Sequence, residues 1–221
     1  MSDLTEKKEA DITSFSAMEN RLKLAEKVLV GIGAEWAYDY DNEDNNRKEK
    51  ILNAYRKLKE LLKDKDYYII TLCIDELIFE IFGDCDRIVA PCGSYCRLQC
   101  DEHLLSKEDS KRYKYADACP VCGKPLGYNN ISNPSYLEEG YLPLFAEYKK
   151  WLMGTVNKKL CILELGCKMQ FPTVIRMPFD KMCSYNLKSV FYRINSSLCQ
   201  HTAENSERGI SVKTDSVEYF L

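Results

Sequence analysis

Apolar residues along this chain follow two kinds of spacing. Apolar positions three or four residues apart predict helices, which we place at 15–25, 51–62, 77–81, 141–156 and 172–186. Short continuous apolar runs predict buried strands, which we place at 28–30, 67–70, 87–90, 160–163 and 190–194, with a final apolar pair around Ile210 and Val217. The alternation of strands and helices predicts an α/β fold with a doubly wound, mostly parallel, Rossmann-like sheet.

This alternation is interrupted between residues 92 and 130, where cysteines, glycines and polar residues replace the periodic apolar positions. A stretch of this length is too short to form a stable hydrophobic core unless a bound metal or another cross-link holds it together. We interpret 92–130 as a small zinc-binding module inserted into a larger domain. Residues 1–91 and 131–221 are predicted to form that larger, Rossmann-like nucleotide-binding domain.

The composition limits the classes of partner. The 221 residues are 45% hydrophobic and 29% charged, with a formal net charge of -3. This near balance offers no broad basic surface for phosphate backbones, so we expect no nucleic-acid partner. No apolar run approaches the roughly 18 residues that span a bilayer, and the polar start MSDLTEKKEADIT lacks a signal pattern. We therefore expect no membrane contact and a cytoplasmic location.

The chain has eleven cysteines and two histidines. In a reducing compartment the thiols are metal ligands, buried apolar residues or reactive groups rather than a disulfide framework, and an odd number cannot all pair. His201 lies in a polar loop with no partner nearby in the sequence, so we expect it to be exposed.

Two close pairs in the insert have the spacing of a zinc site. Two residues separate Cys100 from His103 and two separate Cys119 from Cys122, with fifteen residues between the pairs. Such pairs can converge on a tetrahedral zinc ion, and four protein ligands leave it no open position, which predicts a structural role. Two alternatives stay open: Cys96 replaces His103 as a ligand, or the cysteines are core residues without a metal.

Six short motifs, taken in order, resemble those of the sirtuin family. They are Gly31-Ile32-Gly33-Ala34-Glu35, Thr71-Leu72-Cys73-Ile74-Asp75, Cys92-Gly93, the two metal-spaced pairs, Gly166-Cys167-Lys168 and Ile194-Asn195. The resemblance spans residues 28–220. It implies a sheet domain that binds NAD or ADP-ribose, a small zinc-bearing domain above it, and acyl-lysine deacylation or ADP-ribosyl transfer on a protein substrate in the cleft between them.

The resemblance also implies which residues would hold the dinucleotide: Gly31, Gly33, Ala34, Cys73, Asp75, Gly166 and Asn195. Glycines after a strand let backbone N–H groups approach a diphosphate, and the start of the following helix also favours the anion. Asp75 has a second interpretation as the N-cap of the helix that follows it. The glycine turn by itself is weak support, because any tight strand-to-helix turn can use it.

Several residues depart from the family pattern. Cys92 stands where the family has a histidine that acts as a base, so it is either the catalytic residue or a small buried one. Cys73 replaces an asparagine that orients the nicotinamide ribose, and Glu35 replaces a serine. The family's cofactor loop is cut to a few residues that include four acidic ones, Asp39, Asp41, Glu43 and Asp44. These charges either repel a diphosphate or point away into solvent.

Three candidate functions follow. We predict a sirtuin-like protein with a structural zinc site and a degenerate NAD-binding cleft that has weak or no deacylase activity and still binds an adenine dinucleotide. The alternative is an active NAD-dependent protein-lysine deacylase or mono-ADP-ribosyltransferase. A further alternative is a non-catalytic protein-interaction module.

Overall fold

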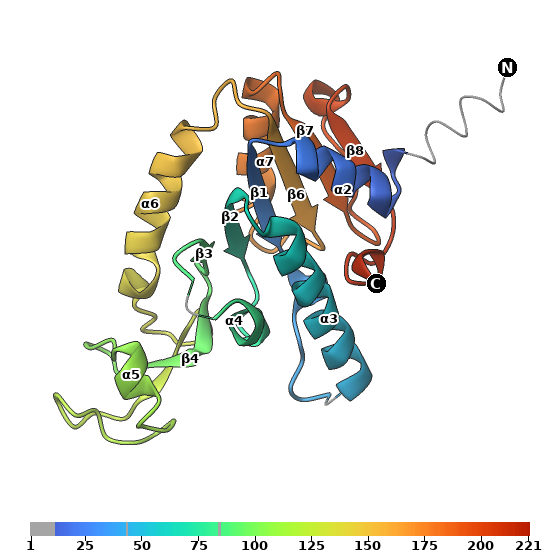
Figure 1. Ribbon diagram of the computed structural model, residues 1–221. Coiled ribbons are helices and arrows are strands. Elements are labelled where there is room, and N and C mark those ends of the chain that lie inside the picture. The colour runs from blue at the N-terminus through green and yellow to red at the C-terminus, as the bar shows by residue number, and fades with distance from the viewer. Residues whose placement is uncertain (1–11, 43, 84) are drawn as a thin grey trace, which may run out of the picture.

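A six-stranded parallel sheet forms the centre of the molecule, in the order β3-β2-β1-β6-β7-β8 (Figure 1). The computed structural model describes residues 12–42, 44–83 and 85–221. The strands are β1 (Lys27–Ile32), β2 (Asp66–Thr71), β3 (Ile88–Val89), β6 (Leu160–Leu165), β7 (Val190–Ile194) and β8 (Gly209–Val212). From β1 the chain runs to β2 and β3 on one side, and it returns later to β6 on the other side of β1. In doubly wound sheets, ligands bind where the strand order reverses in this way, in a crevice at the carboxyl ends of the strands. We call this end of β2, β1, β6 and β7 the crevice.

Helices cover both faces of this sheet. α2 (Phe15–Leu24), α3 (Asn45–Leu62) and α4 (Leu77–Phe82) pack on one face, and α6 (Leu142–Met153) and α7 (Arg176–Tyr185) pack on the other. Side chains alternate along each strand, so Val28 and Val30 enter the first core while Leu29 enters the second. Burial on both faces explains the continuous apolar runs in the sequence.

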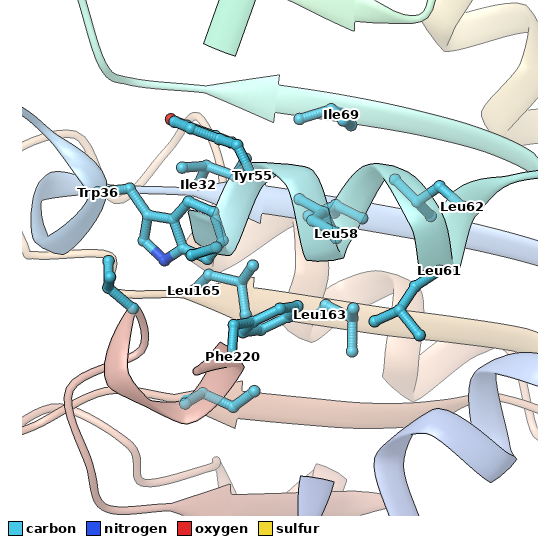
Figure 2. Packing of buried hydrophobic residues seen from close by; sticks show 14 of the residues in the cluster. Ile32, Trp36, Tyr55, Leu58, Leu61, Leu62, Ile69, Leu163, Leu165 and Phe220 are labelled. Carbon is cyan, nitrogen blue, oxygen red and sulfur yellow. The ribbon is translucent and has the colours of Figure 1, made fainter. Parts of the chain in front are cut away.

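Aromatic residues fill the first core where β1 ends. Trp36, in the 3₁₀ helix η1 (Ala34–Trp36), is fully buried against Tyr55 of α3 and Phe220 of η4 (Glu218–Phe220). Its ring centroid lies 4.7 Å from that of Tyr55 and 5.4 Å from that of Phe220. Figure 2 shows Trp36 and Tyr55 near Ile32, and Phe220 near Leu165. The turn after β1 is therefore anchored in the core by its own tryptophan.

The small module has its own antiparallel pair, β4 (Gly93–Gln99) with β5 (Gly127–Asn130), and the short helix α5 (Lys107–Ser110). Its core is a separate cluster of buried residues: Leu98, Cys100, Leu105, Cys119 and Leu126. The chain then passes through η2 (Glu138–Gly140) to α6, and η3 (Ala203–Asn205) precedes β8. The division into domains at residues 91 and 131 stays a prediction.

The predicted fold class, a doubly wound parallel sheet, is confirmed. The helix expected at 172–186 starts later, at Arg176, because residues 172–175 form a turn in which Met177 N–H bonds back to the Pro172 carbonyl. Ile210 lies in β8, whereas Val217 precedes η4. Among the described residues, no helix is long and apolar enough to cross a membrane. The polar start (residues 1–11) and Glu43 lie outside the described residues.

Candidate functional site

Four side chains of the small module converge on one point. The ligand atoms of Cys100, His103, Cys119 and Cys122 all lie within 4.8 Å of one another. Cys100 Sγ is 3.5 Å from His103 Nδ1 and 3.6 Å from Cys122 Sγ. A tetrahedral zinc ion with bonds of about 2.0–2.3 Å places its ligand atoms roughly 3.5–3.7 Å apart, so these separations fit such an ion. The group can therefore hold a metal.

Backbone hydrogen bonds shape the two turns that carry these ligands. His103 N–H donates to Cys100 Sγ at 3.2 Å, and Cys100 N–H donates to the His103 carbonyl at 2.9 Å. In the second turn Gly123 N–H donates to the Cys119 carbonyl, and Gly123 has a φ of 76°, which favours glycine. Cys96 is exposed on β4 and does not belong to the group. The ligand set that the structure brings together is therefore the one with His103.

The predicted cofactor residues gather at the carboxyl ends of four adjacent strands. Gly33 and Ala34 follow β1, Cys73 and Asp75 follow β2, Gly166 follows β6 and Asn195 follows β7. Gly31 instead lies inside β1. A Cβ on Gly31 would lie 2.4 Å from Ile175 Cγ2, so the absence of a side chain lets Ile175 pack closely against β1. Apart from Gly31, the expected residues therefore lie at the crevice, and their hydrogen bonds decide what it can bind.

Glu35 spans this crevice. Its Oε1 accepts hydrogen bonds from the backbone N–H and the hydroxyl of Ser196, at 2.9 and 2.6 Å. Its Oε2 accepts from the N–H and the hydroxyl of Ser216, at 2.8 and 2.7 Å. A Cβ added to Gly166 would lie 2.4 Å from Glu35 Cβ, so the side chain passes directly over this glycine. The carboxylate therefore occupies an anion site built from the loops after β7 and β8.

The backbone of the glycine turn is also engaged. Gly33 N–H donates to the Leu165 carbonyl at 2.8 Å, and Glu35 N–H donates to the Gly166 carbonyl at 3.2 Å. Trp36 N–H closes the 3₁₀ turn on the Gly33 carbonyl at 3.0 Å. These N–H groups are among the donors that a glycine turn offers to a diphosphate. Here they bond within the protein.

The residues after β2 are buried and satisfied. Asp75 Oδ2 accepts from Tyr38 N–H at 2.8 Å and Oδ1 accepts from Leu77 N–H at 3.1 Å, the second at the start of α4. Burial raises the Asp75 pKa despite these backbone donors. The Cys73 thiol lies 3.4 Å from the Gly33 carbonyl, to which it donates, and burial raises its pKa as well.

Asn195 and Cys92 are similarly enclosed. Asn195 Oδ1 accepts from the N–H groups of Ser197 and Leu198, and its Nδ2 donates to the Cys167 carbonyl at 2.9 Å. Cys92 lies in the connection between β3 and β4 and is only 3% exposed. Burial raises its thiol pKa to about 11, so the group is protonated at neutral pH.

One sequence expectation is wrong. His201 was expected to be exposed, but its ring packs edge-on against Phe191, with centroids 4.7 Å apart. Both ring nitrogens are buried without a hydrogen-bond partner among the described residues, and burial lowers the pKa to about 4. The aromatic packing on β7, invisible in the local sequence, draws the ring inward.

Sequence reasoning missed the partners of Glu35. Ser196 and Ser216 are separated from it by 161 and 181 positions. Nothing in the local sequence of either serine indicates an anion site. The one usable signal was the replacement of the family serine by a carboxylate in the glycine turn.

Comparison with known proteins places this fold. No family model matches the chain. A curated Staphylococcus aureus (strain Mu50) protein, a protein ADP-ribosyltransferase, is 21% identical over 185 residues, which are 76% of this chain and 59% of the relative. The chain therefore matches less than two thirds of that protein's length.

Solved structures match almost the whole chain. A structure concerned with sirtuin substrate affinity is 13% identical and covers 94% of this chain and 96% of its own, with a TM-score of 0.61. A Sir2 homologue in complex with NAD is 11% identical and covers 93% and 90%, with a TM-score of 0.55. A Sir2 structure bound to acetylated peptide is 13% identical and covers 91% and 93%, with a TM-score of 0.57. The chain has the sirtuin fold, which confirms the resemblance at that level.

Proposed function

We propose that this chain is a non-catalytic protein with the sirtuin fold, in which zinc staples the small module and the dinucleotide cleft no longer turns over NAD. Its function is then to bind a protein partner rather than to transfer an acyl or ADP-ribosyl group. The observation that carries the proposal is the Glu35 carboxylate, which accepts four hydrogen bonds in the crevice.

The Glu35 contacts oppose dinucleotide binding for an electrostatic reason. A bound diphosphate would need the same loop donors and would lie beside a carboxylate of like charge. Releasing the carboxylate would break hydrogen bonds to a charged acceptor, each worth about 1.5–3 kcal/mol. A ligand would first have to offset that loss, which supports a closed cleft.

Cys92 supports the absence of catalysis independently. A base must accept a proton at working pH, and only a thiolate could do so here. With its pKa raised to about 11 by burial, the thiol is almost entirely protonated near pH 7. Cys73, at the asparagine position of the family, donates weakly to a backbone carbonyl and offers no firm position for a ribose.

Zinc suits the metal group because of its donors. Three thiols and one imidazole are ligands that zinc prefers in structural sites, and the four donors leave no position for a substrate or water. The metal would join the two turns at Cys100 and Cys119, which are both part of the small core of the module.

ADP-ribosyl transfer is the second candidate, because the curated relative has the name protein ADP-ribosyltransferase. Both enzymatic readings require nicotinamide release from NAD. The test is therefore nicotinamide release by the zinc-loaded chain, with and without an acetylated peptide, alongside detection of ADP-ribosylated protein.

We expect no release above background from the wild type or from Cys92→His, since a new base does not free the crevice. Release by the wild type would contradict the non-catalytic proposal. Release by Cys92→His alone would mean that the cleft still binds NAD and lacks only a base, which would overturn the role given to Glu35.

A further inference from the structure

A cavity lies between the small module and the β3 edge of the sheet. Its volume is about 400 Å³, within the range of roughly 300–1,000 Å³ that small-molecule sites occupy. Its lining comes from α4, β3, β4, α5 and the start of α6. None of the described residues that line it belongs to the predicted cofactor set. It is therefore separate from the crevice that Glu35 fills.

Part of the cavity lining is apolar and aromatic. Phe79, Ile88 and Leu144 line it together with Tyr136 and Tyr141. The Tyr136 hydroxyl donates to the Pro91 carbonyl at 3.0 Å, and the Tyr141 hydroxyl donates to Glu138 Oε1 at 2.8 Å. Because both hydroxyls already have acceptors, the two tyrosines offer ring surface to the cavity. Such surface favours an aromatic ligand body through edge and face contacts.

Arg97 contributes a positively charged group to the cavity lining. Its Nε donates to the Leu105 carbonyl at 3.1 Å and its Nη1 donates to the Gly140 carbonyl at 3.3 Å, which fix the guanidinium at the cavity wall. Within the described part of the chain, no carboxylate forms an ion pair with it. Burial lowers its pKa, which reflects the cost of desolvating the charge. The Arg97 side chain is half-buried, and the negative charge of Glu108 acts on it without forming an ion pair. An anionic ligand in the cavity would add the direct partner that this partly desolvated guanidinium lacks among the described residues.

The remaining charges restrict the anion. Lys107 and Lys111 add two more cations on the module side, while Glu76 and Glu80 line the cavity at α4, so these lining charges leave an excess of one positive charge. Two carboxylates on one wall disfavour a ligand with several negative charges. A single carboxylate, whose two oxygens match the guanidinium fork, can reach Arg97 while the body of the ligand keeps to the apolar wall.

We propose that this cavity binds a small aryl-alkyl monocarboxylate, with its carboxylate on Arg97 and its ring among Phe79, Tyr136 and Tyr141. The site joins the metal-bearing module to the sheet domain, so a bound ligand contacts both. The proposal goes beyond the non-catalytic function and does not rest on it, because none of these residues lies in the crevice.

The experiment is calorimetric titration of the zinc-loaded full chain with 3-phenylpropanoate, its neutral amide and 3-phenylpropyl phosphate. We expect saturable binding of one equivalent of the carboxylate, and at least tenfold weaker binding of both the amide and the dianionic phosphate. Arg97→Gln should weaken carboxylate binding at least tenfold. Arg112→Gln is the matched control on the same module, because the Arg112 side chain is 74% exposed and lies outside the lining.

The Ala90→Leu variant tests the same cavity without changing Arg97, in case Arg97→Gln loses binding only because it folds poorly. Ala90 lines the cavity from the sheet side, so a larger side chain fills it while Arg97 stays in place. We expect this variant to lose binding with an unchanged metal content. Absence of saturable carboxylate binding to the wild type would overturn the proposal. Equal carboxylate affinity of the Arg97→Gln and Arg112→Gln variants would also overturn it, as would undiminished binding by Ala90→Leu. None of these results bears on nicotinamide release, so the two proposals fail separately.

Discussion

The metal group and the crevice show opposite uses of polar side chains. In the small module, three sulfurs and one imidazole nitrogen face one another within 4.8 Å, an arrangement that suits a bound metal ion. In the crevice, Glu35, Asp75 and Asn195 already have backbone or hydroxyl partners. The first region can take up a metal ion, whereas the polar groups of the second are satisfied without a ligand. On the proposed function, the hydrogen bonding of these polar groups, more than their residue types, distinguishes a site that binds a ligand from one that is closed.

The largest expected effect comes from breaking the metal group. Cys119→Ser removes one ligand, and structural zinc is worth on the order of 10 kcal/mol to folding in zinc-finger peptides. We expect the metal content to fall from one equivalent to a small fraction, with loss of protease resistance in 92–130. Metal analysis and limited proteolysis measure this. The control is Cys96→Ser, an exposed cysteine outside the group that should keep full metal. Full metal content in both variants would contradict the assignment of Cys119 as a metal ligand.

The second-largest expected effect is a loss of stability when Glu35 is truncated at the crevice. In an open binding site, truncating a ligand-binding carboxylate leaves stability nearly unchanged. Glu35→Ala should instead lower the free energy of unfolding by about 2–4 kcal/mol, because it strands the buried Ser216 N–H and removes charged hydrogen bonds. Urea denaturation gives the value. Glu207→Ala, at an exposed glutamate, should stay within about 0.5 kcal/mol of the wild type. Equal stability of the two variants would show that Glu35 is free to move.

The smallest effect concerns His201, a buried polar group that lacks the partners Glu35 has. Burial, assisted by the nearby Arg193 charge, lowers its pKa from 6.5 to about 4. The unfolded chain therefore takes up a proton first, so the neutral ring contributes stability above pH 6.5 that is lost as the pH falls toward 4. Allowing for partial exposure, the loss is roughly 2 kcal/mol.

His201→Phe should remove that part of the pH dependence while keeping the ring contact with Phe191. The free energy of unfolding of each protein, measured at pH 7 and at pH 4, gives its change with pH. The contributions of other titrating groups cancel when the change in the variant is compared with that in the wild type. An unchanged pH dependence in the variant would mean that the ring titrates normally in the folded protein.

The fold was predictable because its signals are local. Strands buried on both faces, such as Leu160–Leu165, leave continuous apolar runs. The metal group was predictable for the same reason, since each ligand pair lies on one short turn. Spacing could not choose between His103 and Cys96. The structure does, because β4 places Cys96 on an exposed surface.

The state of the crevice could not be predicted, because it depends on contacts between distant segments. The sequence showed that Glu35 replaces the family serine, and it left open whether nearby acidic residues repel a diphosphate. The hydrogen bonds from Ser196 and Ser216 to Glu35 form only in the folded chain, because these segments are distant in sequence. His201 was misjudged in the same way, since its burial depends on Phe191 of another element. Arg97 gave no signal at all, because its exposure to a cavity arises where the module meets the sheet.

Titration of the zinc-loaded chain with ADP-ribose is the most direct test of the claim that Glu35 closes the crevice. The account predicts no heat of binding for the wild type at ligand concentrations up to the millimolar range, and measurable binding for Glu35→Ser, which frees the loop donors. Micromolar binding of ADP-ribose to the wild type would contradict it and would return the chain to the candidates for NAD chemistry.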